Sequence, residues 1–240
     1  SDMQITILTR APNFPQGKVF PGYKNRLKKK EKIGNIEVIR VWSFISANKG
    51  FALRILDYIS FAFVAFLAGL FVKTDVIIAT SPQFFTTWAA YGLSIIKKVP
   101  WIFEVRDLWP ESIKAVGAIK QNYTIELLEK VELFLYRKAN HVVVVTDSFK
   151  DNLVKRGINP EKIHIVKNGS NLSLFSPRPK DLELITTHQL EGKAIITYIG
   201  TLGMAHGLDF ILRSIKDLPE NFHLLICLLY TSDAADEGLG

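Results

Sequence analysis

The sequence predicts an α/β protein with a doubly wound, mostly parallel sheet. Short apolar, β-branched runs alternate with longer segments of helical periodicity along the chain. Runs such as Asp75–Ala79 and His141–Val145 are apolar at most positions, which is typical of strands buried on both faces of a parallel sheet. With 240 residues, 48% of them hydrophobic, the chain can form one large domain or one domain and part of another.

The first part of the chain is predicted to contain two strands, a long loop and an apolar helix. Gln4–Thr9 and Ile36–Trp42 are β-rich, whereas Arg10–Lys24 contains prolines and glycines typical of a loop. Phe51–Val72 is strongly apolar, but its uncharged part, Tyr58–Val72, is 15 residues long. Because a membrane-spanning helix needs ~20 apolar residues, we expect a buried or interfacial helix.

The later elements continue the alternation of strands and helices. Further strands are expected at Asp75–Ala79, Trp101–Val105, His141–Val145, Lys162–Val166 and Lys193–Ile199. Helices are expected at Gln83–Lys97, Thr124–Lys138, Ser148–Arg156 and Gly207–Lys216. The segment Ser176–Pro179 resembles a linker, so we place a first domain at residues 1–175 and the start of a second at residues 176–226.

A polar cluster follows the predicted strand Trp101–Val105. Glu104, Arg106, Asp107 and Glu111 surround Pro110, which can begin a helix but cannot continue a strand ladder. Ligands of open parallel sheets bind beyond the carboxyl ends of the strands, so this cluster is a candidate site. The alternative is that Arg106 and Asp107 pair with each other and cap the next helix.

Basic residues are concentrated near the start of the chain. The chain carries 30 Lys+Arg against 23 Asp+Glu, and six of the cations lie between Lys24 and Lys32. Such a run suits an anionic membrane, a phosphate or a nucleic acid, although a solvated loop is the simpler interpretation. Aromatic residues interleaved with the cations would favour nucleic acid, and this run contains none, so we expect no nucleic-acid partner.

A glycine-rich turn follows the predicted strand Lys193–Ile199. The sequence Gly200-Thr201-Leu202-Gly203 precedes a predicted helix, and free backbone N–H groups at such a position favour an anion. A glycine turn between a strand and a helix is also common as a simple tight corner.

Ordered motifs across the chain closely resemble the family-4 glycosyltransferases of the GT-B fold. They are APNFPQGKVFPGYK, NKGFALRILDYISFAF, DVIIATSPQFFT, FEVRDLWPES, VELFLYRKA, VVVTDSF, KIHIVKNGSNLSLF and YIGTLGMAHGLD. The nearest branch resembles bacterial enzymes of surface polysaccharide (O-antigen or capsule) synthesis that transfer N-acetyl-fucosamine-type sugars. The resemblance implies two Rossmann-like domains, with the acceptor on the first and a nucleotide-sugar on the second. It also implies a retaining transfer that requires no metal and no cofactor.

The resemblance also suggests roles for individual residues. Asp107 would accept a hydrogen bond from a sugar hydroxyl, and Arg106, which stands where many relatives have His, would anchor an anion or a sugar. The donor diphosphate would contact Gly200, Thr201, Gly203 and His206, the last of these replacing a Lys or Arg of many relatives. We assign to the acceptor side Tyr23, Lys24, Ser81 and Glu111.

These roles lead to expectations about partners and location. We expect a nucleotide-sugar donor, UDP-linked, a lipid-diphosphate-linked sugar acceptor and an anionic membrane surface, with the enzyme peripheral on the cytoplasmic face of the cell membrane. Two alternatives remain, a nucleotide-sugar epimerase of GT-B shape and a polyanion-binding module without catalysis.

Both ends of the chain differ from the family pattern. The strand and glycine-containing loop that precede Gln4 in the family, and its downstream Glu-rich donor motif, are expected to be missing. The segment CLLYTSDAADE, Cys227–Glu237, matches the translation of a transposon-type sequencing adapter, so residues 227–240 are expected to be non-native. The alternative is that Leu224–Tyr230 is a genuine strand. We expect a fragment that is inactive without the rest of the protein.

Overall fold

The structure of the protein is a computed structural model. It describes residues 3–13, 17–46, 51–81, 84–108, 123–200 and 207–228. The chain divides into two compact units, Ser1–Asn168 and Gly169–Gly240, here called unit 1 and unit 2. The boundary lies a few residues before the predicted one at residue 175. Each unit is described by itself.

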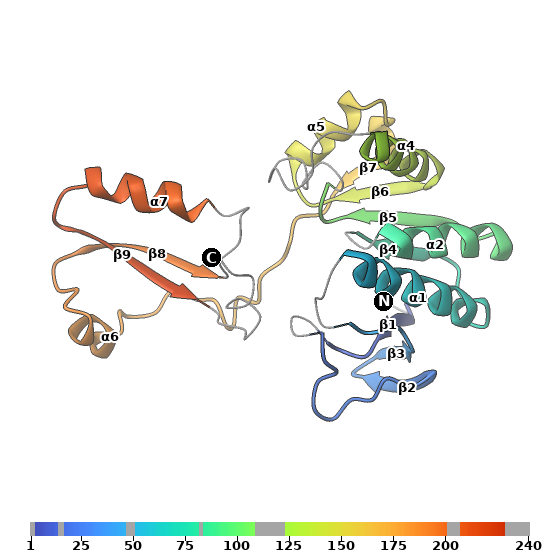
Figure 1. Ribbon diagram of the computed structural model, residues 1–240, viewed down its shortest axis with the longest axis horizontal. Helices are drawn as coiled ribbons and strands as arrows, with labels where there is room; N and C mark the ends of the chain where they lie inside the picture. Colours follow the sequence, from blue (N-terminus) through green and yellow to red (C-terminus); the bar gives the residue numbers. More distant parts are fainter. Residues whose placement is uncertain are drawn as a thin grey trace. The chain divides into compact units, whose positions relative to one another are not determined.

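The described residues of unit 1 form two sheets. The first has the order β1 (Ile5–Arg10), β3 (Ile36–Val41) and β2 (Lys28–Ile33). The second has the order β4 (Ile77–Thr80), β5 (Trp101–Val105), β6 (His141–Val144) and β7 (Ile163–Ile165), and all its strands are parallel. Figure 1 shows these strands one above another, from β2 at the bottom through β3, β1, β4, β5 and β6 to β7 at the top. The predicted α/β fold with parallel strands is confirmed.

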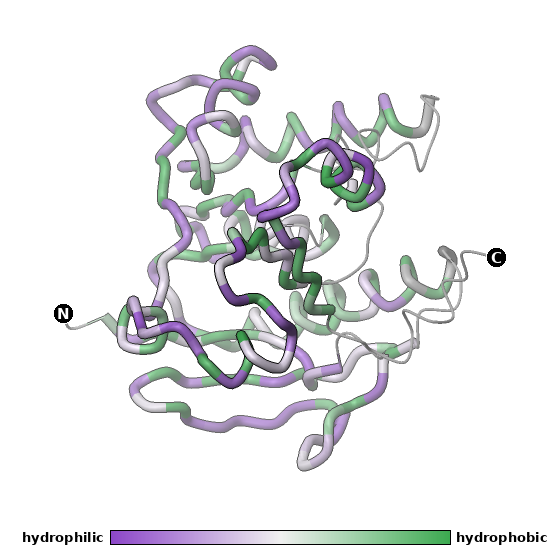
Figure 2. The backbone as a smooth tube through the Cα atoms, turned by 90° about the vertical axis from the view of Figure 1, so that its left-hand side faces the viewer, coloured by the Kyte–Doolittle hydropathy of each residue, from purple (hydrophilic) through white to green (hydrophobic). Residues whose placement is uncertain are grey.

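The second part of the basic run, Lys28–Lys32, belongs to strand β2, so the interpretation of these residues as a loop is wrong, whereas Lys24 and Arg26 precede the strand. β2 pairs antiparallel with β3, and Figure 2 shows the hydrophilic stretch that contains it at the bottom of the view. Lys30 contacts Glu37 at 2.8 Å, and Lys29 contacts Glu31 at 3.0 Å. β2 ends its sheet, where lysines oppose pairing with a further strand. Lysine is a poor strand former, so the pairing with apolar β3 outweighs local propensity here.

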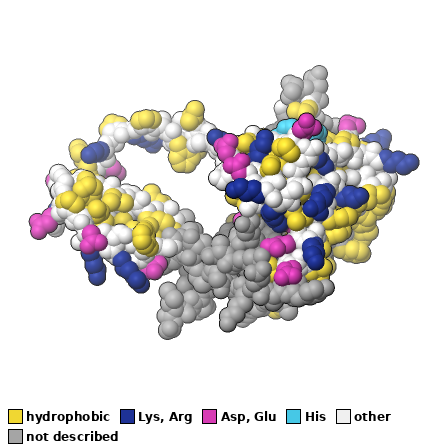
Figure 3. All heavy atoms as spheres, turned by 90° about the horizontal axis from the view of Figure 1, so that it is seen from above, with side chains coloured by type: hydrophobic (Ala, Val, Ile, Leu, Met, Phe, Trp, Pro, Cys, Tyr) yellow, Lys and Arg dark blue, Asp and Glu magenta, His cyan; other side chains and the backbone are white. Residues whose placement is uncertain are grey.

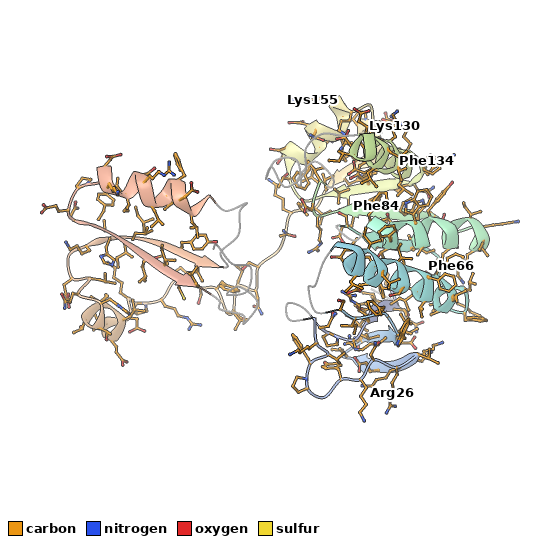
Figure 4. All side chains as sticks on the ribbon, in the orientation of Figure 1. Arg26, Phe66, Phe84, Lys130, Phe134 and Lys155 are labelled. Atoms are coloured by element: carbon orange, nitrogen blue, oxygen red, sulfur yellow. The ribbon has the colours of Figure 1, made fainter. Side chains whose placement is uncertain are left out.

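Helices α1 (Phe51–Leu70) and α2 (Phe84–Lys97) pack closely against each other. A Cβ atom at Gly69 would lie 2.6 Å from Leu93 Cδ1, and one at Gly92 would lie 3.0 Å from Phe66 Cε2. Figure 4 labels Phe66 on α1. The two glycines therefore allow the helices to approach closely.

One stripe of α1 is buried and another is exposed. Phe61 and Ala65 pack with Ile39 and Val41 of β3 in one core cluster. Asp57 of α1 forms a buried ion pair with Arg10 at the end of β1. The exposed stripe includes Leu56, Ile59, Phe63 and Leu67. Among the described residues, no helix is long and apolar enough to cross a membrane.

The larger core lies around β5 and β6. Trp101, Phe103 and Val105 of β5 are at most 2% exposed and pack with residues of α2, α4 (Tyr123–Lys138) and α5 (Asp147–Lys155). Buried Glu132 of α4 accepts hydrogen bonds from Tyr136 at 2.7 Å and from Arg156, just after α5, at 2.5 Å. This buried ion pair links the two helices. A short 3-10 helix, Pro160–Lys162, precedes β7.

The described residues of unit 2 form a two-stranded parallel sheet and short helices. β8 (Ala194–Gly200) pairs with β9 (Phe222–Leu228), and α7 (Leu208–Ser214) and a 3-10 turn (Ile215–Asp217) lie between them in sequence. α6 (Leu182–Thr187) precedes β8. β9 includes Cys227 and Leu228, which pair with Ile199 and Gly200, so these two residues form part of a strand. The adapter origin of residues 227–240 stays a prediction.

Candidate functional site at the carboxyl ends of β4 and β5

The parallel pairing of β4 with β5 brings two predicted site segments together. Thr80, the last residue of β4, is in register with Glu104 of β5. The chain then continues into Ser81 on one side and into Arg106 and Asp107 on the other. The carboxyl ends of adjacent parallel strands meet at the same edge of the sheet, where ligands of such folds bind.

Arg106 forms its ion pair with Glu104. Its Nη2 lies 3.0 Å and its Nε 3.1 Å from Glu104 Oε1. Thr80 Oγ1 donates to the other carboxylate oxygen of Glu104 at 2.6 Å. Among the described residues, the ion-pair partner of Arg106 is thus Glu104 and not Asp107, which answers the alternative in which Arg106 and Asp107 pair with each other.

The Ser81 hydroxyl holds the backbone after β5. It accepts a hydrogen bond from the Arg106 backbone N–H at 3.1 Å and donates to the Asp107 carbonyl at 3.3 Å. The Ser81 N–H in turn donates to the Glu104 carbonyl at 2.9 Å. Ser81 is buried, so its hydroxyl positions the turn that carries Arg106 and Asp107. Its predicted role on the acceptor side stays a prediction.

Glu104 is held in its ionised form. Partial burial of the carboxyl opposes ionisation, but hydrogen bonds from Thr80 and Arg106 and the positive charge of Arg106 outweigh it. The net effect is that the pKa of Glu104 lies below its ordinary value of 4.5. At neutral pH, Glu104 therefore fixes the Arg106 guanidinium, which is half-exposed at 53%.

The predicted acceptor residues Tyr23 and Lys24 lie in the loop before β2. The ring of Tyr23 faces the Arg40 guanidinium at 4.9 Å and the Lys29 ammonium at 5.8 Å. These cation–π contacts hold Tyr23 against the first sheet. The contacts of Tyr23 therefore connect it to β2 and β3, and the Ser81–Arg106–Asp107 group is built without it.

The predicted donor residues are in unit 2. Gly200 is the last residue of β8, and a Cβ atom there would lie 3.2 Å from the Tyr198 hydroxyl. Gly207, with φ of +57°, precedes α7 and provides no side-chain cap. Four predicted site residues lie outside the described residues: Glu111, Thr201, Gly203 and His206.

Two further residues belong to the site, and neither of them was given an individual role from sequence, although Glu104 is part of the predicted polar cluster. Thr80 and Glu104 form the hydrogen-bonded support of Arg106. Their positions in the sequence pointed to the site. Thr80 is the last residue of the apolar strand β4 and precedes Ser81, and Glu104 is the second-last residue of β5, two positions before Arg106. Within the residues that the structure describes, no three His, Cys, Asp or Glu side chains form a metal-binding group.

A shallow hollow of about 660 Å³ lies elsewhere in unit 1. It is lined by Met3, Gln4, Lys30, Glu31, Lys32, Asn35 and Glu37. These residues lie at or near the start of β1 and along β2 and β3, away from the carboxyl ends of β4 and β5. The hollow is therefore separate from the hydrogen-bonded cluster at the ends of β4 and β5.

Comparisons with known proteins agree with this architecture. A solved structure of HepE from Anabaena in complex with UDP and glucose is similar to this chain, with a TM-score of 0.57 and 14% sequence identity. The alignment covers 84% of this chain and 50% of the HepE chain. Sucrose-phosphate synthase from Thermosynechococcus elongatus has a TM-score of 0.63 and 15% identity, and covers 93% of this chain and 52% of that chain. At these identities the similarity supports the GT-B type of α/β fold.

A sequence relative and a family model identify the family of this chain. The protein named "Probable glycosyltransferase WbjE" of Pseudomonas aeruginosa is 24% identical over 118 residues, which are 48% of this chain and 30% of WbjE. This chain thus spans about half, or less, of the relatives named here. The model of the family described as Glycosyltransferase Family 4 matches residues 4–174. The chain therefore belongs to Glycosyltransferase Family 4.

Proposed function

We propose that the whole protein transfers a sugar from a UDP-linked donor to a lipid-diphosphate-linked glycan in the synthesis of a bacterial surface polysaccharide. The bond between the donor sugar and its diphosphate breaks and UDP leaves with the bonding electrons. A bond to an acceptor hydroxyl oxygen forms with the same anomeric configuration, and the hydroxyl proton passes to the leaving diphosphate. The enzyme acts at the cytoplasmic face of the membrane without a metal. Membership of Glycosyltransferase Family 4 supports the type of reaction.

The observation that carries the proposal is the cluster of Ser81, Glu104, Arg106 and Asp107 at one sheet edge. Ser81 fixes the backbone of the turn, and Glu104 fixes the Arg106 guanidinium. A carboxylate beside a preorganised cation suits a polyhydroxylated, anionic substrate, because Asp107 can accept hydrogen bonds from sugar hydroxyls. Arg106 can contact a phosphate or a sugar oxygen.

The donor side of the proposal rests on unit 2 and on a structural neighbour. β8 ends at Gly200 and the next described helix is α7, which is the order of strand and helix at a phosphate-binding site. Backbone N–H groups and cations there would stabilise the charge of the leaving diphosphate. HepE of Anabaena, which shares the fold, has been solved with UDP-glucose, and this supports UDP as the carrier.

The membrane part of the proposal rests on α1 and on basic residues elsewhere in unit 1. Leu56, Ile59 and Phe63 of the exposed stripe are 43–62% exposed. A helix that is apolar on its outer face suits the boundary between lipid headgroups and acyl chains. β2 supplies lysines, and Figure 3 shows further Lys and Arg side chains among hydrophobic ones on another face of unit 1. Basic residues attract anionic lipids.

The test is a transfer assay with the full-length enzyme. Purified protein is incubated with UDP-sugars and lipid-diphosphate-linked acceptors, with and without EDTA. We expect transfer with retention that resists the chelator and is lost on Asp107→Asn while the thermal melt is unchanged. The matched control is Asp151→Asn, because Asp151 is exposed on α5.

Three outcomes would contradict parts of the proposal. Epimerisation of the free UDP-sugar without transfer would favour an epimerase. Loss of transfer in EDTA that Mg²⁺ restores would reject the metal-free mechanism. Full activity of Asp107→Asn would place the chemistry away from this cluster.

A further inference from the structure

Two histidines of unit 1 lie against each other, apart from the cluster proposed for sugar transfer. His141 begins β6, and His164 is the middle residue of β7, the neighbouring parallel strand. His141 Nδ1 lies 2.9 Å from His164 Nε2, and the ring centroids are 5.0 Å apart. One ring nitrogen of each histidine is therefore directed at the other ring.

The pairing of β6 with β7 holds the two rings on one face of the sheet. Val143 is in register with His164, and His141 precedes Val143 by two positions, so both histidines lie on the same face. Val142 and Val144 point the other way, into the core, and are fully buried. The closely packed core thus fixes the strand that carries His141.

Both histidines are accessible from solution. Each is exposed, and Figure 3 shows histidine, in cyan, at the surface of unit 1. An exposed hydrogen bond between two imidazoles adds little stability, because water can replace either partner. A ligand from solution can reach the facing nitrogens of both rings.

The lysine next to β7 is directed away from the pair. Lys162 immediately precedes β7, and its ammonium donates a hydrogen bond to the Arg137 carbonyl of α4 at 2.8 Å. The charge of Lys162 is thus held at the end of α4 and not between the two rings.

We propose that His141 and His164 together bind a divalent transition-metal ion, such as Zn²⁺, with water completing the coordination sphere. Neutral imidazole is a common ligand of Zn²⁺, Cu²⁺ and Ni²⁺. The ring that carries its proton on the facing nitrogen moves this proton to its other nitrogen, and the two lone pairs then bind the metal. This proposal is independent of the proposed function.

The distance between the two nitrogens suits chelation of one ion. Two nitrogens bound to one tetrahedral zinc at about 2.1 Å are about 3.4 Å apart. The observed separation of 2.9 Å is slightly shorter, and a rotation of the imidazole rings about their soft χ2 torsions can open it. Hard cations such as Mg²⁺ prefer oxygen ligands, so the pair selects against them.

A bound metal would fasten a short strand at the end of its sheet. β7 has three residues and, among the described strands, ends the second sheet beside β6. An ion held by both strands stabilises the folded state, because its two ligands are close together only there. Zinc should therefore raise the temperature at which unit 1 unfolds.

The experiment uses the full-length enzyme with Zn²⁺ alone as the probe. Isothermal titration calorimetry near neutral pH compares wild type with His141→Gln, His164→Gln and the double variant. Each single replacement should weaken zinc binding by at least about tenfold, because one of two protein ligands is lost. The double variant should lose little more, because residues that hold one ion are coupled. The control His188→Gln, at an exposed position in unit 2, should bind like wild type.

Thermal unfolding provides a second measurement. Tryptophan fluorescence follows unit 1, and Zn²⁺ should raise the unfolding midpoint of wild type and His188→Gln but not of the His141 and His164 variants. In EDTA all midpoints should agree, because both rings are exposed. Unchanged zinc binding in both single variants, or losses that add in the double variant, would overturn the proposal. A response to Mg²⁺ equal to that to Zn²⁺ would overturn it as well.

Discussion

Glu104 and Arg106 form an ion pair of 3.0 Å at the end of the central strand β5. The two residues are separated by one position, and Thr80 of the neighbouring strand donates a hydrogen bond to the same carboxylate. Strand β4 therefore contributes directly to the placement of a cation on β5. The next residue, Asp107, follows on a turn that the Ser81 hydroxyl holds.

Replacement of Glu104 tests whether the carboxylate positions Arg106. In the full-length enzyme, Glu104→Gln should lower kcat/KM by roughly tenfold, because the guanidinium loses its fixed orientation. Steady-state transfer kinetics measure the effect. The control is Glu191→Gln, at an exposed position in unit 2, which should leave kcat/KM unchanged. If the two variants had equal kcat/KM values, Glu104 would have no role in positioning Arg106 for transfer.

The lowered pKa of Glu104 predicts a pH dependence of stability. A carboxyl whose pKa is lower in the folded state stabilises the protein above its ordinary pKa of 4.5, and this contribution disappears as the pH falls through the folded-state pKa. The difference in unfolding free energy between wild type and Glu104→Gln should therefore shrink below about pH 4.5. Urea denaturation at pH 7 and at acidic pH checks this, and a constant difference would contradict it.

The buried Glu132–Arg156 pair predicts a large stability effect. Arg156→Met would leave the Glu132 carboxylate, 2% exposed, without its cation. We expect a loss of about 3–5 kcal/mol in unfolding free energy. All four tryptophans belong to unit 1, so tryptophan fluorescence during denaturation follows the relevant unit. The control Arg137→Met changes an exposed arginine of α4 and should cost far less.

The proposed docking on a membrane through the exposed stripe of α1 can be tested by mutation. Phe63→Ser combined with Leu67→Ser should lower binding to anionic vesicles by roughly tenfold or more, because buried apolar side chains contribute about 2 kcal/mol each. Vesicle flotation measures the bound fraction. Phe210→Ser in α7, at a position 73% exposed, is the matched control. Unchanged binding in the double variant would reject docking through α1.

Much of the architecture follows from local sequence patterns. The apolar runs at β4 to β8 and the periodicity of α2, α4 and α5 predict these elements within a few residues. Parallel pairing also follows from strands such as β6, which is valine-rich and has helices before and after it. The meeting of Ser81 with Arg106 and Asp107 follows from the same topology.

The rest depends on long-range contacts that local patterns do not encode. β2 contains mostly lysines and resembles a solvated loop, and its strand form comes from pairing with apolar β3. The partner of Arg106 could not be chosen from sequence, because Glu104 and Asp107 both lie within two positions of it along the chain. The cross-strand bond from Thr80 to Glu104 stabilises the arrangement with Glu104.

The close approach of α1 and α2 has a consequence for how this sequence can diverge. Gly69 faces Leu93, and Gly92 faces Phe66, so each glycine and its larger partner share one volume. A homologue that gains a side chain at Gly69 must move or shorten the side chain at Leu93, or its helices must separate. In an alignment, these positions should therefore change in pairs, and a large residue at both members of a pair would mark a branch with a different helix spacing.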